Sequence, residues 1–227
     1  MNVKIDRAFL DKVSGIRLGV LEAEVKVEAS NEALKQDMLA FLNEMRSNLP
    51  TADISKQENI MASRKAYRVL GKDPTRYRVS SEKLLRRVTK GEGIDWINNV
   101  VDLSNWVSVK SMNSVGTYDL GLLEGELTFT YGSEGEQYLN IGNQEMNLES
   151  LPIFKDIKGA FGSTTADSKG TAVTETTQHM ILNIISFNES EVLEEHLHFA
   201  KQLFETYATV SGMKMGIVSS KGYREIL

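Results

Sequence analysis

The chain has 227 residues, of which 41% are hydrophobic and 25% are charged. These values are typical of a globular protein that can bury a sizeable core without covalent cross-links. The sequence contains no cysteine, which excludes disulfides, thiolate catalysis and cysteine-based zinc sites. We therefore expect a protein of a reducing compartment, in the simplest case the cytoplasm.

The sequence predicts neither secretion nor a membrane partner. Residues 1–15 lack the continuous apolar stretch of a signal peptide. Apolar runs such as MILNIISF, at 180–187, are far shorter than the roughly 20 residues that cross a bilayer.

The net charge is −5, but the basic residues are concentrated in one segment. Residues 64–90 carry a net charge of +8, whereas the other 200 residues carry −13. Such a segment can hold a phosphate backbone through its local field, and it can equally be a solvated helix face with a loop. Tyr67 and Tyr77 lie between the charges and could stack on bases. The candidate RNA-binding residues are Arg64, Lys65, Arg68, Lys72, Arg76, Arg78, Arg86, Arg87 and Lys90.

The first half of the chain reads as one strand followed by helices. Apolar and polar residues alternate from Ile16, which predicts a half-buried strand. Residues 30–45 have helical spacing, with Ser30 as candidate N-cap. Further helices are expected over 51–69 and over 80–91, where Ser80 or Ser81 would cap the start and Gly91 the end.

A fourth helix is expected over residues 97–112. One of its faces contains Ile97, Val100, Val101, Ser104, Val107 and Ser108. The residues Asp102, Asn105 and Trp106 lie off this face.

After Asp119 the apolar period changes to two, which predicts strands. Residues 125–133 and 136–143 should pair as a hairpin, and further strands are expected at 151–156 and 179–187. Asn188 as N-cap and Glu191 at the third position predict a long helix that ends near Gly212. A last strand follows at 213–220. This mixture without strict alternation predicts one α+β domain.

The three histidines predict no metal site. His196 and His198 are two positions apart on a predicted helix and point roughly 200° apart, so they cannot bind one ion together. His179 begins an apolar strand. Walker A, dinucleotide-binding and GxSxG motifs are absent from the sequence. We expect no metal and no cofactor, and an enzyme of this composition would orient water with hydroxyls, amides and carboxylates.

Three stretches, at 76–120, 135–156 and 159–187, follow one another at a characteristic spacing. The most diagnostic pieces are VVDLSNWV at 100–107, GTYD at 116–119 and FGS at 161–163. In order and spacing they resemble the B3/B4 domain of the phenylalanyl-tRNA synthetase beta subunit, in a free-standing form. The resemblance covers roughly residues 60–190.

This resemblance implies an α+β fold built as a layered mixed sheet with packed helices. The order of the expected elements, outside the resemblance, makes residues 1–60 a strand–helix lobe of the same domain. Residues 61–227 would form the B3/B4-like part with a C-terminal helix and strand. The helix, a GTYD turn and an FGS loop would line one pocket. The candidate catalytic residues are Thr117, Asp119 and Thr164. The candidate substrate-binding residues are Asn105, Gly116, Tyr118, Gly162, Ser163 and Asp167, with the Gly162 and Ser163 amides facing an ester oxyanion.

The chain departs from the family pattern at two positions. Gly116 stands where the editing domain has a histidine, and Thr164 stands where it has the glutamate that reads the tyrosine hydroxyl. A neutral threonine bonds a hydroxyl less strongly than a carboxylate does.

Two hypotheses follow from the resemblance. In the first, the chain is an aminoacyl-tRNA deacylase that hydrolyses mischarged aminoacyl-tRNA in trans. In the second, it is a non-catalytic module that binds a free amino acid or the end of a tRNA. The sequence lacks class II synthetase motifs, so the chain should not charge tRNA.

Overall fold

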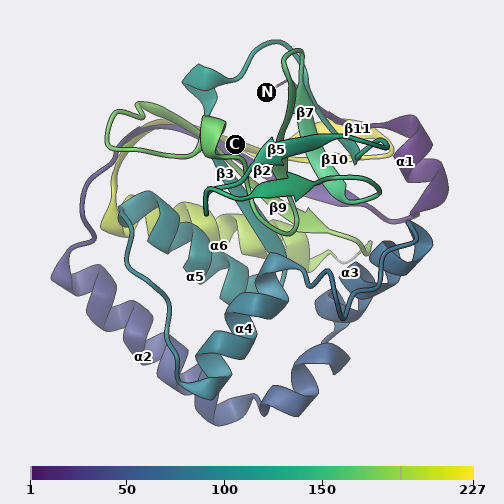
Figure 1. Cartoon of the computed structure of the whole chain (residues 1–227). Coiled ribbons are helices and arrows are strands. Elements are labelled where there is room, and N and C mark those ends of the chain that lie inside the picture. Colours follow the sequence, from purple (N-terminus) through teal and green to yellow (C-terminus); the bar gives the residue numbers. More distant parts are fainter. Residues whose placement is uncertain (1, 190) are drawn as a thin grey trace.

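Strand β2 (Arg17–Lys26) lies at the centre of the molecule because apolar side chains on both of its faces are buried. Leu21 and Ala23 pack against helices on one face, and Leu18 and Val20 pack against a second sheet on the other. The computed structural model, which describes residues 2–189 and 191–227, therefore has three layers (Figure 1).

The central layer is a five-stranded antiparallel sheet of order β11–β10–β2–β9–β3. The strands besides β2 are β3 (Ser114–Asp119), β9 (His179–Ser186), β10 (Thr209–Ser219) and β11 (Gly222–Glu225). Strand β3, at one edge, carries the GTYD residues.

The second layer is a four-stranded sheet of order β1–β4–β7–β8, in which β1 is parallel to β4 and the other pairs are antiparallel. Its strands are β1 (Val3–Ile5), β4 (Leu127–Tyr131), β7 (Pro152–Asp156) and β8 (Gly159–Ser163). A separate hairpin joins β5 (Gln137–Leu139) to β6 (Glu145–Asn147).

The third layer is helical. Figure 1 shows α2 (Glu32–Asn48), α4 (Ser80–Lys90), α5 (Asn99–Ser111) and α6 (Val192–Tyr207) gathered on one side of the five-stranded sheet. Helices α1 (Arg7–Lys12) and α3 (Glu58–Val69) contribute Phe9 and Ala66 to the core between the two sheets. Among the described residues no helix is long and apolar enough to cross a membrane.

The expected α+β class with a layered sheet and packed helices is confirmed. Several local expectations are confirmed too: the strands at 151–156 and 179–187, and the helix over 80–91, which ends at Gly91 in the left-handed conformation with φ 80°. Residues 1–60 contribute β2 to the middle of the central sheet.

Other local expectations are wrong. The GTYD residues and Phe161 to Ser163 lie in strands β3 and β8, because they pair with β9 and β7. The predicted hairpin partner of residues 125–133 is incorrect, since β4 pairs with β1 and β7. The helical stretch expected over 51–69 is confirmed, except that it divides at Gln57 into a 3₁₀ helix, Thr51–Lys56, and α3.

Helix boundaries also differ from expectation. Asn31, not Ser30, caps α2, because its side chain accepts the Leu34 N–H. Val79 caps α4 without a side-chain hydrogen bond. Helix α6 ends at Tyr207, since Thr209 already pairs with β2, and its N-cap is Glu191 rather than Asn188. Asp102 and Trp106 are buried in α5 because neighbouring elements cover that side of the helix as well.

Candidate functional site

The two family stretches meet where the edges of the two sheets come together. Strand β3 is the edge of the five-stranded sheet and β8 is the edge of the four-stranded sheet. From Ser163, the last residue of β8, the chain forms a loop to residue 168, here called the rim loop (163–168), and returns to β3, where Ala172 bridges to Tyr118. Ser114 Oγ of β3 donates to Thr164 O at 3.4 Å. The structure thus brings the stretches around 116–119 and 161–168 side by side.

Tyr118 fills the space between the two glycines of these stretches. Its side chain is fully buried and packs edge-on against Phe161, with 4.9 Å between ring centroids. A methyl group added to Gly116 or to Gly162 would overlap the Tyr118 hydroxyl. Both positions therefore require glycine for the close approach of this phenol.

The Tyr118 hydroxyl is tied to Asp167. It donates to Asp167 Oδ1 at 2.8 Å, and the Ser163 backbone N–H donates to the same oxygen at 3.2 Å. Burial raises the pKa of Asp167 to about 7, although these two hydrogen bonds act in the opposite direction. Burial, followed by the charge of Asp167, also raises the pKa of Tyr118 well above its ordinary value. Asp167 is thus a carboxyl group that titrates near neutral pH.

Two further tyrosines hold the rim loop. Tyr67 of α3 lies with its hydroxyl 2.6 Å from Thr164 Oγ1 and 2.9 Å from Thr165 Oγ1. Tyr138 of β5 donates to the Ala166 carbonyl oxygen at 2.5 Å. The sequence offers Tyr67 as a residue that could stack on bases, but its side chain is fully buried, so this expectation is wrong. Tyr138 is not among the expected site residues.

The three candidate catalytic side chains have separate partners. Thr117 faces the helical layer, where its Oγ1 lies 2.8 Å from Ser104 Oγ of α5. Asp119 accepts from Gly121 N at 2.9 Å and from Thr177 Oγ1 at 2.7 Å. Thr164 is fully buried and contacts Tyr67. Side chains alternate along β3, so Thr117 and Asp119 point away from Tyr118 and the rim loop.

The other expected site residues are placed as follows. Asn105 is half-buried on α5, next to Ser104. The Ser163 N–H, expected to face an oxyanion, donates to Asp167, and Ser163 Oγ accepts from the Thr165 and Ala166 N–H groups. Gly162 is the residue of β8 paired with Phe154. Ser104, expected only on the packing face of its helix, is the partner of Thr117 on the helical side of β3.

The basic segment separates into groups in space. Arg64, Arg78 and Arg86 surround the buried carboxylate of Glu82. Arg87 pairs with Asp95 at 2.9 Å, and Lys90 lies 3.9 Å from Glu92. The remaining candidates are Lys65, Arg68, Lys72 and Arg76, of which Lys72 and Arg76 lie over the Tyr77 ring.

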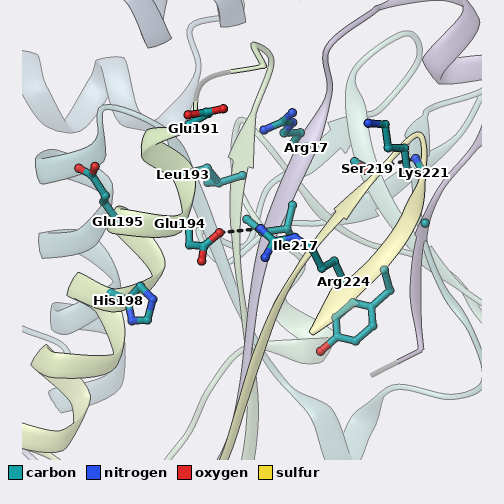
Figure 2. Close-up of a pocket in the computed structure, with 12 residues that line it drawn as sticks. Arg17, Glu191, Leu193, Glu194, Glu195, His198, Ile217, Ser219, Lys221 and Arg224 are labelled. Carbon is teal, nitrogen blue, oxygen red and sulfur yellow. Dashed lines mark hydrogen bonds and ion pairs between the residues drawn. The ribbon is translucent and has the colours of Figure 1, made fainter. Parts of the chain in front are cut away.

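A hollow of about 690 Å³ lies elsewhere, between the start of α6 and the β10–β11 hairpin (Figure 2). Figure 2 shows Glu194 paired with Arg224 across it, at 2.6 Å, with Arg17 and Lys221 on the sheet side. None of the expected site residues lines this hollow. Among the described residues no group of three or more His, Asp or Glu side chains could hold a metal ion.

The sequence profile of the B3/4 domain matches residues 62–205, a range that contains β3, β8, the rim loop and the basic segment. The chain belongs to the B3/4 domain family.

This B3/4 domain protein matches a small part of longer relatives. It is 29% identical over 103 residues, 44% of the chain, to the phenylalanine–tRNA ligase beta subunit of Solibacter usitatus. It is 30% identical over 107 residues, 46% of the chain, to the beta subunit of Legionella pneumophila. Each match spans 13% of the relative's length.

The fold is similar to that of a solved structure, an N-terminal fragment of the phenylalanyl-tRNA synthetase beta subunit from Pyrococcus horikoshii. The TM-score is 0.50 at 12% identity, over 100% of this chain and 54% of the other. At this identity the similarity concerns the fold alone. The family expected from the sequence is confirmed by the profile and the relatives together.

Proposed function

We propose that this chain binds the 3′ end of a tRNA, with the rim loop at the aminoacyl end and the basic residues of α3 and α4 along the phosphate backbone. The observation that carries the proposal is the direct contact between these two parts. Ser80 N donates to Thr164 O at 2.8 Å, and Lys83 Nζ donates to Thr165 O at 3.2 Å. Tyr67, within the basic segment, bonds both threonines.

The family supports the same ligand. The relatives are named as beta subunits of a tRNA ligase. Because the matches span 13% of those subunits, the ligase activity itself is not carried over. A basic surface beside a small polar site can bind the aminoacylated end of a tRNA.

The binding test is a filter-binding or gel-shift titration with purified tRNA at several salt concentrations. Phosphate contacts release counterions, so the logarithm of the affinity should fall linearly with the logarithm of salt concentration. Arg68→Gln, on the exposed side of α3, should weaken binding and lower this slope. Arg7→Gln removes one positive charge on α1 and is the matched control. Equal affinities for both variants and the wild type would contradict this use of the basic segment.

Hydrolysis of the aminoacyl ester is a second candidate, and one specific observation favours it. Asp167 has a pKa raised to about 7, and both of its hydrogen bonds go to Oδ1. A carboxylate that titrates near the operating pH is suited to act as a general base. Asp167 Oδ2 would take a proton from water as the water oxygen attacks the ester carbon. The carbon–oxygen bond to the ribose then breaks, and the proton passes to the leaving ribose oxygen.

The hydrolysis test mixes the protein with a panel of correctly charged and mischarged tRNAs and follows ester loss against a no-protein control. Selective loss from one species would establish a trans-editing enzyme and identify its substrate. Asp167→Asn should then abolish the activity, and the wild-type rate should rise through about pH 7. Asp119→Asn tests the role first expected for Asp119, which an unchanged rate would exclude. tRNA binding without ester loss would leave a non-catalytic binding module.

A further inference from the structure

Three arginines converge on one buried carboxylate. Arg64 Nη1 lies 3.0 and 2.9 Å from the two oxygens of Glu82, and Arg86 Nη2 lies 2.9 Å from Oε1. Arg78 Nε approaches the same Oε1 to 3.6 Å, beyond hydrogen-bond distance. The Glu82 side chain is 0% exposed. One negative charge thus faces three positive charges, and the cluster carries a net charge of +2.

The third arginine has an unused donor. Arg78 Nε is buried and has no hydrogen-bond partner in the described part of the chain. Buried N–H groups in proteins nearly always have an acceptor, so Arg78 Nε is a donor that the described residues leave open. Although Nε itself is buried, the side chains of Arg64, Arg86 and Arg78 are 16%, 26% and 36% exposed, so an anion can approach the cluster from solvent.

The surroundings make the cluster more positive. Burial lowers the pKa of Lys83, and the nearby positive charge of Arg78 lowers it further. The carboxylate of Asp73 also interacts with Arg64 and Arg68, but it already accepts the Thr75 N–H at 2.8 Å. The two carboxylates therefore do not cancel the positive charge around them. That charge comes from Arg64, Arg68, Arg78, Lys83 and Arg86.

We propose that Arg64, Arg78 and Arg86, oriented by Glu82, form a binding site for one phosphate group. The planar guanidinium fork matches the oxygens of a phosphate, and hydrogen bonds to Glu82 hold two of the three forks in place before a ligand arrives. Shortly after Arg78 in the chain, α4 contacts the rim loop through Ser80 N and Lys83 Nζ. The phosphate is therefore a phosphodiester next to the 3′-terminal nucleoside, a placement that rests on the proposed function.

The phosphate chemistry can be tested without any RNA. Inorganic phosphate is titrated into ¹⁵N-labelled protein at constant ionic strength, and the arginine Nε–H signals are followed by NMR. We expect a saturable shift of the Arg78 signal and no saturable shift of the Arg7 signal, since Arg7 pairs with Asp11 on α1. Absence of a saturable shift at Arg78, Arg64 and Arg86 would overturn the site, whether or not RNA binds elsewhere.

The placement is tested with a thermodynamic cycle. Arg78→Gln removes a charge without removing a hydrogen bond from Glu82, so the fold should be preserved, and Arg7→Gln is the control of equal charge change. Arg78→Gln should weaken binding of intact tRNA about tenfold, as expected for loss of a charged hydrogen bond. It should also reduce the salt slope by about 0.7, the contribution of one single-strand phosphate.

The second half of the cycle uses the same tRNA without its last two nucleotides. On this RNA the effect of Arg78→Gln should fall below about twofold, because the phosphate is missing. A tenfold loss on both RNAs would overturn the placement at the 3′ end. If the wild type binds neither RNA, the proposed function fails, and the phosphate titration still decides the cluster separately.

Discussion

The Tyr118 hydroxyl donates to Asp167 Oδ1 at 2.8 Å and so joins two segments that lie 49 residues apart in the chain. This bond crosses the junction of the two sheets and fixes the rim loop against β3. The phenol occupies the space left by Gly116 and Gly162. The interior of this site is therefore built from the chain's own tyrosine, and its accessible part is the half-buried middle of the rim loop, residues 165–167.

Asp167 should make the stability of the protein depend on pH. Its pKa is raised from 3.8 to about 7, so between these values the folded state binds more protons than the unfolded state. The free energy of unfolding should therefore fall as the pH rises from about 4 to about 7. A pKa shift of this size corresponds to about 4 kcal/mol in the free energy of unfolding. Because Asp167 is half-buried and solvent screens its charge, we expect roughly half of this change.

The measurement is urea unfolding of the wild type and of Asp167→Asn at pH 5 and pH 8. The wild type should lose stability at the higher pH relative to the variant, whose amide does not titrate. An identical pH dependence of the two proteins would contradict the raised pKa.

Gly162→Ala should destabilise the fold by overpacking. The new methyl group overlaps the Tyr118 hydroxyl, which is fixed by Asp167, so the ring must shift within a close-packed core. Such overpacking costs about 1–3 kcal/mol. Gly170→Ala is the matched control in the same region, because the nearest atom to its methyl group is Ser168 Oγ at 3.6 Å. Thermal unfolding should place Gly162→Ala several degrees below both the control and the wild type.

Glu82→Gln should be strongly destabilising. The substitution leaves Arg64, Arg78 and Arg86 without their shared countercharge, and removing one partner of a buried ion pair costs about 3–5 kcal/mol. Asp95→Asn breaks the exposed pair with Arg87 and should cost about 1 kcal/mol or less. Equal losses in urea unfolding for the two variants would show that Glu82 does not organise the cluster.

Tyr67→Phe should loosen the rim loop while the fold persists. The substitution removes the bonds to Thr164 Oγ1 and Thr165 Oγ1 and leaves the buried ring in place. Hydrogen exchange of the amides at 163–167 should become faster, with about 1–2 kcal/mol of stability lost. Tyr207→Phe removes a hydroxyl bonded to Asp37 and is the control, because Tyr207 lies on α6. Unchanged exchange in the rim loop would contradict the role of Tyr67.

The sequence by itself determined the elements whose origin is local. Alternating apolar residues mark β2 and β4, short apolar runs mark β7 and β9, and Gly91 marks the end of α4, because periodicity and turn chemistry act over a few residues. The order and spacing of the motifs also determined the family.

Only the tertiary structure decided how these elements combine. Backbone pairing made the expected turn at 116–119 a strand and gave β4 the partners β1 and β7. Chain packing brought Asp167 to Tyr118 and Arg64 to Glu82, and it paired Thr117 with Ser104 and Asp119 with Thr177. These relationships join residues far apart in the chain, and long-range contacts leave no periodic trace in the sequence from which they could be read.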